Sequence, residues 1–260
     1  MKPGVLLIDK PPGWTSHDVV AKLRGVLRER RIGHTGTLDP MATGLLVCLI
    51  GKATRLASLM ESNKTYTAGV LFGYVSDTLD ITGKMSATGA AQPPPEAVRE
   101  ALKDFTGEIT QLPPMVSAVK VGGRRLYDIA RKGGSAERKP RPVTVYELGY
   151  TDDGQLRVVC SGGTYVRALI DDLGARLGCG AVMRSLRREV SGCFTVDCAV
   201  TPENARAEHI LPVTAALPQL PAVYDAGEGG EGARWLLDGR GEVAALLRGG
   251  KRIDLSGDTA

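Results

Sequence analysis

Residues 33–44 read GHTGTLDPMATG and lead directly into the apolar run LLVCLI at residues 45–50. The first part is polar and holds three glycines, which permit tight turns and the close approach of a ligand to the backbone. Pro40 disfavours helical geometry at Asp39, so that the carboxylate is displayed from a defined loop. A carboxylate, an imidazole and three hydroxyls between core elements are typical of a functional loop. An aspartate that caps an ordinary turn would give the same pattern.

Segments of helix and strand type alternate on both sides of this stretch. Residues 4–9 and 45–50 predict strands, and Ser16 is expected to cap a helix whose apolar residues repeat at helical spacing. This alternation predicts an α+β protein with a mixed, mostly antiparallel central sheet flanked by helices. The other strands are expected at 64–72, 143–150, 155–160, 182–190 and 194–196, and the other helices at 95–105, 126–131 and 165–177.

The character of the sequence changes after residue 200. The run Thr201-Pro202-Glu203 predicts the start of a helix, because proline is favoured at the first helical position. Residues 212–221 contain prolines and residues 227–232 are rich in glycine, which indicates a linker and a loop. We therefore expect a main domain at 1–200 and a small C-terminal unit at 201–260.

The composition is that of an ordinary globular protein, with 43% hydrophobic and 24% charged residues, and it excludes collagen-like, disordered and coiled-coil chains. No apolar run approaches the roughly 20 residues that span a bilayer, and residues 9–12 interrupt the apolar core that a signal peptide needs. We expect a cytoplasmic protein with no membrane contact. The three histidines and five cysteines have no metal-ligand spacing, so no metal site is expected.

Basic residues are concentrated in the first 200 residues. The chain has a formal net charge of +4, although residues 201–260 hold six Lys and Arg against nine Asp and Glu. Clusters lie at 22–31, 120–141 and 184–188. Such clusters suggest a polyanionic partner, because phosphate contacts dominate the affinity for nucleic acids; solvated helix faces would look the same. The second cluster includes Arg124, Arg125, Arg131 and Lys132.

Two further stretches carry polar groups on core elements. Lys64 and Tyr66 are two residues apart on a predicted strand, so their side chains point to the same face and offer a cation and a phenol to one ligand. A half-buried tyrosine in an ordinary strand is the alternative. Arg167 follows two glycines and falls in the first turn of a predicted helix. A cation there is unfavourable for the helix dipole and suggests an anionic partner close by; a solvent-exposed arginine is the alternative.

Together these stretches resemble the bacterial tRNA pseudouridine synthases that isomerise the uridine at position 55, in the T loop. The matching blocks follow the order of the family and span residues 4 to about 200. Val116, where the family more often has an aromatic residue, and the pair Met183-Arg184 depart from the pattern. The blocks are 9–16, 33–44, 64–66, 113–120 with 127–133, 163–174 and 186–188.

The resemblance implies a pseudouridine synthase fold with a small, here atypical, RNA-binding unit at the C-terminus. It implies that Asp39 is the catalytic aspartate, that Arg167 pairs with it, and that Tyr66 stacks on the uracil and takes part in the proton transfer from C5. It implies substrate contacts for His34, Lys10, Lys64 and Tyr165. The second basic cluster is expected to contact the RNA backbone through Arg124, Arg125, Arg131 and Lys132.

The implied reaction breaks a C–N bond and forms a C–C bond without net redox change, so no cofactor is expected. Asp39 supplies the ionised carboxylate that it needs, and the target base has to be flipped out of the folded RNA. Attack on the sugar, attack on the base and support of elimination remain open. We expect a monomer that acts on the T stem-loop of tRNA without a guide RNA.

Two other kinds of protein would share these features. One is a non-catalytic RNA-binding or RNA-folding module that uses the same surface; the joint presence of Asp39, Tyr66 and Arg167 argues against it. The other is a guide-RNA-dependent relative in the same superfamily. That type usually has extra terminal extensions for partner proteins, and we expect none here.

Overall fold

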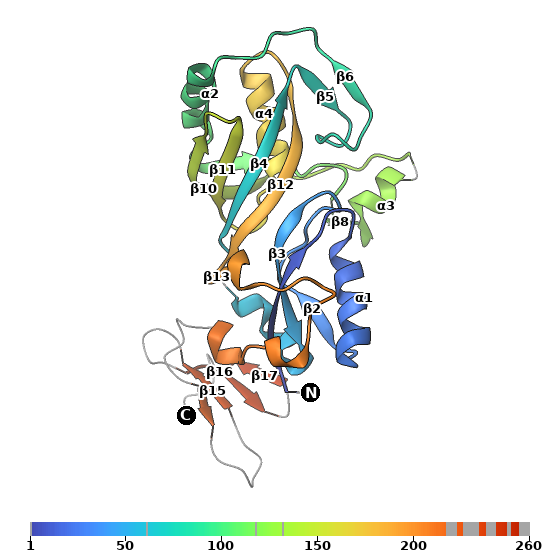
Figure 1. Cartoon of the computed structure of the whole chain (residues 1–260), viewed down its shortest axis with the longest axis vertical. Coiled ribbons are helices and arrows are strands. Elements are labelled where there is room, and N and C mark those ends of the chain that lie inside the picture. The colour runs from blue at the N-terminus through green and yellow to red at the C-terminus, as the bar shows by residue number, and fades with distance from the viewer. Residues whose placement is uncertain are drawn as a thin grey trace.

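A nine-stranded sheet forms the centre of the molecule (Figure 1). The computed structural model describes residues 2–60, 62–117, 119–131, 133–216, 223–225, 234–237, 243–248 and 251–254. The main path of the sheet is β1-β3-β12-β4-β11-β10-β7, with β2 paired to β3 and β13 paired to β12. Only the β3–β12 pairing is parallel, which confirms the mixed, mostly antiparallel sheet. The strands are β1 (Gly4–Lys10), β2 (Ile32–His34), β3 (Thr43–Ile50), β4 (Lys64–Phe72), β7 (Gly107–Gln111), β10 (Arg141–Tyr150), β11 (Gln155–Cys160), β12 (Ala181–Ser191) and β13 (Phe194–Thr195).

Helices and short hairpins surround this sheet. In Figure 1, α4 lies next to the long strands β4 and β12, α2 lies beside β10 and β11, and α1 lies beside the lower half of the molecule. The helices are α1 (Ser16–Leu27), α2 (Pro95–Leu102), α3 (Leu126–Arg131) and α4 (Val166–Arg176), with 3₁₀ turns at Gly51–Leu59, Lys103–Phe105, Val196–Cys198, Ala207–His209 and Val213–Ala216. The hairpins are β5 (Tyr74–Ser76) with β6 (Met85–Ala87), and β8 (Lys120–Val121) with β9 (Arg124–Arg125). No helix of the described residues is long and apolar enough to cross a bilayer.

β3 is apolar along almost its whole length because both of its faces are buried. Leu46 and Cys48 belong to the large core that also contains the apolar side of α1, whereas Leu45 and Val47 belong to a second core. β1 divides its side chains between the two cores in the same alternating way, because successive residues of a strand point to opposite faces. The loop that precedes β3 is therefore attached to one of the most deeply buried strands.

Two predictions about helix starts were wrong. Thr15, not Ser16, caps α1: its Oγ1 accepts the Asp18 N–H at 3.0 Å, while the Asp18 carboxylate accepts the Thr15 N–H at 2.8 Å. Thr201 begins a single turn and no helix, closed by the Asn204 N–H on the Thr201 carbonyl at 3.1 Å. The backbone of Arg206 is extended, which ends helical geometry after that turn.

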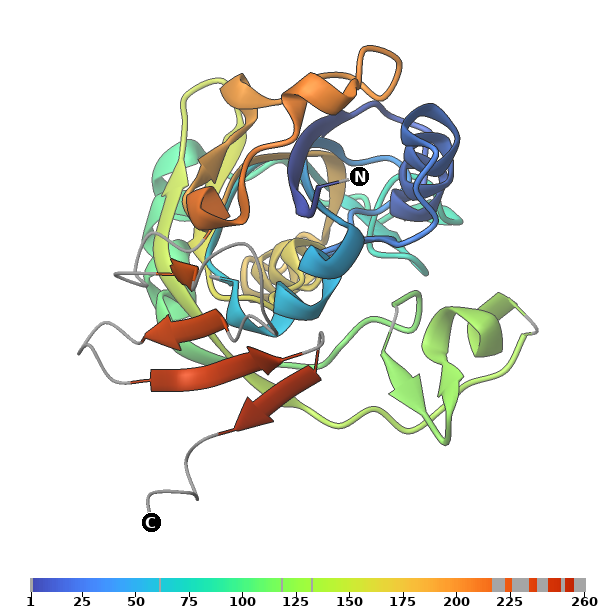
Figure 2. The same cartoon turned by 90° about the horizontal axis from the view of Figure 1, so that it is seen from below.

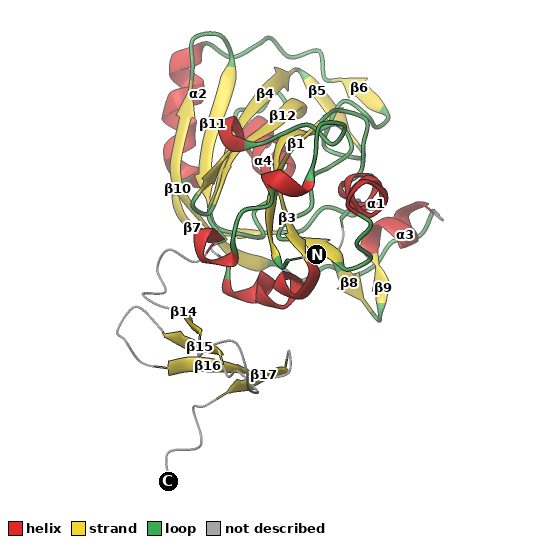
Figure 3. Ribbon diagram, turned by 60° about the horizontal axis from the view of Figure 1, so that its bottom comes forward, coloured by secondary structure: helices red, strands yellow, loops and turns green. Residues whose placement is uncertain are grey.

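The C-terminal part forms a separate four-stranded antiparallel sheet (Figure 3). Its strands are β14 (Val223–Asp225), β15 (Arg234–Leu237), β16 (Val243–Arg248) and β17 (Lys251–Asp254). The predicted loop at 227–232 and most of the predicted linker lie outside the described residues. The domain boundary at residue 200 stays a prediction, since Leu211 still pairs with Val5 of β1 through two backbone hydrogen bonds of 2.8 and 2.9 Å.

Gly44 is required where β3 meets β12. Its φ is +97°, and an added Cβ would lie 2.3 Å from the Arg188 carbonyl oxygen. We expect Gly44→Ala to lower the free energy of unfolding by about 2–4 kcal/mol, because it adds left-handed strain to a backbone clash. Urea unfolding measures the effect. Gly149→Ala is the control, since nothing lies within 4 Å of its added Cβ; equal loss in both variants would contradict the argument.

Candidate active site

The loop between β2 and β3 holds Asp39 in a fixed backbone frame. On one side, the Leu38 N–H donates to the Ser16 hydroxyl at 2.8 Å, and that hydroxyl donates to the Leu38 carbonyl at 3.2 Å. Leu38 itself is buried in the large core. A turn follows, in which the Ala42 N–H donates to the Asp39 carbonyl at 3.1 Å. The loop is thus an ordered structure and not merely a polar connection.

Lys10 holds the other side of the same loop. Its fully buried ammonium group donates to the carbonyls of Pro40 at 3.2 Å, Trp14 at 2.7 Å and Pro11 at 3.0 Å. Burial lowers the pKa of Lys10 to about 8. Because three protein carbonyls already take its three N–H groups, the geometry favours a role in holding the loop. The substrate contact predicted for Lys10 stays a prediction.

Asp39 and Arg167 form a two-pronged ion pair. Arg167 Nε lies 2.9 Å from Asp39 Oδ2, and Nη2 donates to Oδ1 at 3.1 Å. The Arg167 side chain is only 4% exposed, whereas that of Asp39 is 32% exposed. Arg167 also donates to the carbonyls of Thr78 at 2.9 Å and Val116 at 3.0 Å. The solvent-exposed alternative for Arg167 is therefore wrong, and the anionic group near it is Asp39.

A second carboxylate, missed by the sequence analysis, completes this arrangement. Asp80 is buried, and its Oδ2 lies 3.7 Å from Arg167 Nη1. Its Oδ1 accepts hydrogen bonds from the hydroxyls of Thr78 at 2.7 Å and Thr82 at 2.5 Å and from the Thr82 N–H at 2.9 Å. One guanidinium thus neutralises two carboxylates, of which only Asp39 is partly open. The sequence signal for Asp80 is weak, because aspartate among serines and threonines is also ordinary turn composition.

The surroundings pull the pKa of Asp39 in opposite directions. Burial raises it and dominates, the charge of Arg167 lowers it, and the charge of Asp80 raises it again. A charge-assisted pair of this geometry orients the carboxylate and favours its ionised form. The arrangement can therefore present an oriented, reachable anion in a largely desolvated place.

Tyr66 and Lys64 share the buried face of β4. Tyr66 is 7% exposed and belongs to the large core, so it is more buried than the sequence alternative of a half-buried tyrosine; its substrate role stays a prediction. Burial raises the pKa of Tyr66, and the charge of Arg188 on the neighbouring strand opposes this shift. Lys64 donates to the Ser62 carbonyl at 2.6 Å, and burial together with the Arg188 charge lowers the pKa of Lys64 to about 8. The structure brings both side chains together with Arg188, next to the loop of Asp39.

His34 and Tyr165 flank the loop and the helix that carry the ion pair. Among the residues that the structure describes, the buried Nδ1 of His34 has no hydrogen-bond partner, and burial lowers the pKa of the ring. Tyr165 directly precedes α4. Its N–H donates to Gln111 Oε1 at 2.9 Å, and its carbonyl accepts from Gln111 Nε2 at 3.3 Å. These two bonds fix the start of the helix that holds Arg167. The substrate contacts predicted for His34 and Tyr165 stay predictions.

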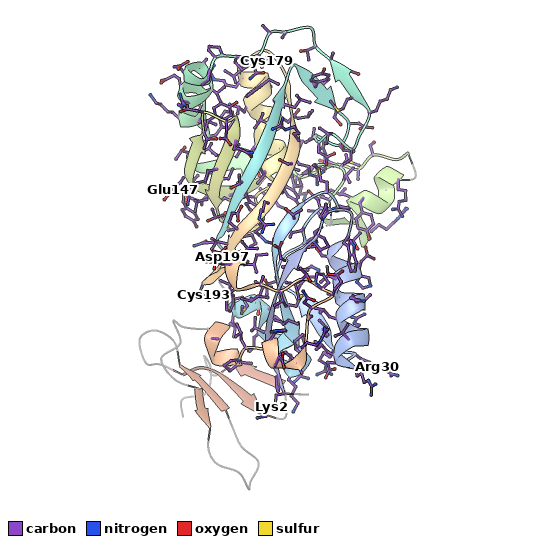
Figure 4. All side chains as sticks on the ribbon, in the orientation of Figure 1. Lys2, Arg30, Glu147, Cys179, Cys193 and Asp197 are labelled. Carbon is purple, nitrogen blue, oxygen red and sulfur yellow. The ribbon has the colours of Figure 1, made fainter. Side chains whose placement is uncertain are left out.

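The basic clusters differ in their exposure. Arg124 and Arg131 are exposed on the β8–β9 hairpin and α3, which project from the body (Figure 2). The side chain of Arg125 and the whole of Lys132 lie outside the described residues. In the first cluster, Arg30 lies exposed at the surface beyond the end of α1 (Figure 4).

In the predicted third cluster, at 184–188, Arg184 is exposed and its contact with a polyanion stays a prediction, whereas the other two arginines are engaged within the protein. Arg188 is buried, and Arg187 pairs with both oxygens of Asp9 at 2.9 and 3.1 Å. Arg184 lies at a β-bulge of β12, between Met183 and Ser185, which accounts for the unusual pair there. Among the described residues, no group of three His, Cys, Asp or Glu side chains is placed to hold a metal ion.

Comparison with known proteins gives consistent matches along the chain. Residues 24–166 match the TruB family pseudouridylate synthase N-terminal domain, and residues 167–217 match the tRNA pseudouridylate synthase B C-terminal domain. The tRNA pseudouridine synthase B of Dechloromonas aromatica (strain RCB) is 42% identical over 266 residues, which cover 98% of this chain and 88% of that protein. The protein of the same name from Heliobacterium mobile is 47% identical over 209 residues, which cover 76% and 67%.

A solved Cbf5–Nop10–Gar1 complex contains a chain of similar fold, with a TM-score of 0.65 at 28% identity over 94% of this chain and 78% of that one. Fold and sequence together define the class as a pseudouridine synthase. The chain belongs to the TruB family, and it isomerises uridine to pseudouridine in tRNA. The predicted family, fold and reaction are thereby confirmed.

The junction of the two family matches falls inside the first turn of α4 and is not a structural boundary, since β12 belongs to the main sheet.

Proposed function

We propose that this enzyme modifies the uridine at position 55 in the T loop of tRNA, as a monomer in the cytoplasm and without a guide RNA. We further propose that Asp39 is its catalytic carboxylate. The observation that carries the role of Asp39 is its partly exposed carboxylate, held by a buried guanidinium. The position of the uridine and the oligomeric state rest on the family resemblance.

The chemistry assigns different roles to the members of the site. Attack on the sugar, attack on the base and support of elimination all need an ionised carboxylate at Asp39. Arg167 donates to Asp39 and to two backbone carbonyls, so it acts through Asp39 as a positioning residue. Tyr66 supplies the aromatic wall that retains the detached uracil, and retention of the base makes its reattachment effectively unimolecular. The phenol also serves the proton transfer from C5.

Tritium release from tRNA tests the proposed function. The purified protein is mixed with an unmodified tRNA transcript labelled with tritium at C5 of uridine, with no other RNA present. We expect one equivalent of release, mapped to the T-loop uridine and absent from a transcript with cytidine at position 55. No release together with tight tRNA binding would favour the non-catalytic RNA-binding module. Release that requires added RNA or protein would favour the guide-dependent relative.

The exposed arginines of the β8–β9 hairpin and α3 predict a salt-dependent RNA contact. We expect the joint change of Arg124→Gln and Arg131→Gln to reduce the slope of log affinity against log salt by about two, one for each lost phosphate contact. Filter binding of tRNA at several salt concentrations measures the slope. Arg99→Gln with Arg157→Gln is the control, because both are partly exposed and paired with carboxylates. Equal slopes in both double variants would mean that net charge alone matters.

A further inference from the structure

Arg188 is among the largest fully buried side chains, and it has no carboxylate within ion-pairing distance in the described part of the chain. Arg187, its neighbour on β12, is 39% exposed and pairs with Asp9 at 2.9 Å and Glu189 at 3.6 Å. The half-exposed arginine thus has two counterions and the buried one has none. Burial of an unpaired charge lowers the stability of a fold. The stability of the protein therefore does not explain why Arg188 is buried here.

The hydrogen bonds of Arg188 go to the two ends of the Asp39 loop. Its Nε donates to the Leu45 carbonyl at 2.6 Å, and its Nη2 donates to the Gly36 carbonyl at 3.0 Å. The backbone of Arg188 also pairs with Gly44, where the missing Cβ allows the close approach. One side chain therefore bridges both ends of the loop at residues 36–45.

The same residue ties this loop to the strand of Tyr66. Arg188 is the register partner of Tyr66 in the β12–β4 pairing and of Gly44 in the β12–β3 pairing. Its remaining nitrogen, Nη1, is buried and has no hydrogen-bond partner within the described ranges of the chain. Lys10 holds the middle of the loop at Pro40, so Arg188 and Lys10 support different points of it.

We propose that Arg188 is a positioning residue for catalysis: it fixes both ends of the Asp39 loop against the strand that carries Tyr66. The carboxylate and the phenol then keep their separation when the uridine enters. This inference rests on the proposed function of Asp39 and Tyr66. Two other roles for Arg188 are less suitable. A purely structural role does not explain the residue, because the fold gains little from an unpaired buried charge. A direct RNA contact does not explain it either, because Arg188 is 1% exposed.

The test compares Arg188→Met and Arg188→Lys with the control Arg187→Met. Single-turnover rates at saturating enzyme, tRNA affinity and thermal unfolding are measured for each. We expect Arg188→Met to lower the rate about 100-fold, as a misplacement near 1 Å does, with tRNA affinity within threefold and no loss of thermal stability. Arg188→Lys should react at least tenfold faster than Arg188→Met, because a lysine still donates to one loop carbonyl. Arg187→Met should stay within threefold of the unchanged rate.

Three results would overturn the inference: a rate within threefold of the unchanged protein in Arg188→Met, a loss of affinity that equals the loss of rate, or no recovery by lysine. If Arg188→Met does not fold, Arg188→Lys decides: a folded variant with the unchanged rate overturns the inference, and a folded variant slowed several-fold at unchanged affinity supports it. Asp39→Asn is assayed in parallel. If it is inactive, a fast Arg188 variant refutes only the positioning role; if it is active, the proposed catalytic role of Asp39 fails.

Discussion

Asp39→Asn is expected to abolish turnover, with a fall of at least about 10⁴-fold, and to leave tRNA affinity within a few-fold. Asparagine keeps the size of the side chain and an acceptor for Arg167, but it cannot supply the anion that each form of the mechanism requires. Tritium release under single-turnover conditions measures the rate, and filter binding measures the affinity.

The matched control for this variant is Asp104→Asn. Asp104 accepts from Arg176 Nε at 2.8 Å, much as Asp39 pairs with Arg167 Nε at 2.9 Å, but the Asp104 pair is exposed. We expect the control to keep full activity. If Asp39→Asn instead lost stability and tRNA binding together with activity, Asp39 would be the structural turn residue that the sequence also allows.

Arg167→Met is expected to lower turnover about 10³-fold and to lower the free energy of unfolding by about 3–5 kcal/mol. Its removal leaves Asp80 buried and Asp39 largely desolvated without a counterion, and breaking a buried pair in this way is strongly destabilising. Urea unfolding and single-turnover rates measure the two effects. Arg176→Met, which breaks only the exposed pair with Asp104, should change neither.

The pH profile separates positioning of Asp39 from a general loss of structure. The pKa of Asp39 is already raised by burial, so activity should fall on the acid side at a higher pH than for an ordinary aspartate. The charge of Arg167 lowers that pKa, and its removal should therefore move the acid limb further toward neutral pH. An acid limb that stays in place would mean that Arg167 does not act through Asp39.

Much of the fold could be predicted because its signals are local. The strand at 64–72 and the helix at 126–131 have the bounds that the periodicity of their apolar residues predicts. The loop of Asp39 was recognisable from its glycines and from Pro40, whose backbone preferences do not depend on distant partners.

The part that could not be predicted depends on contacts between distant segments. Lys10 and Arg188 are charged and so would be placed at the surface, yet both are buried because they bond backbone carbonyls of the Asp39 loop. Asp80 looks like a turn residue until the fold places Arg167 beside it. Thr201 has a good helix-start sequence, but the extended backbone at Arg206 ends the turn.

The position of β12 in the sheet determines the order in which the enzyme folds during its synthesis. β12 lies between β3 and β4 and is the strand that joins the two halves of the sheet, yet it begins at Ala181, 131 residues after β3 ends at Ile50. At 5–20 residues per second, the ribosome needs roughly 7–26 s to make the intervening chain. We expect ribosome-bound chains that stop before β12 to be digested readily by protease at residues 33–50. The chain then becomes competent for chemistry in one late step, when β12 enters the sheet and brings Arg188 to the loop.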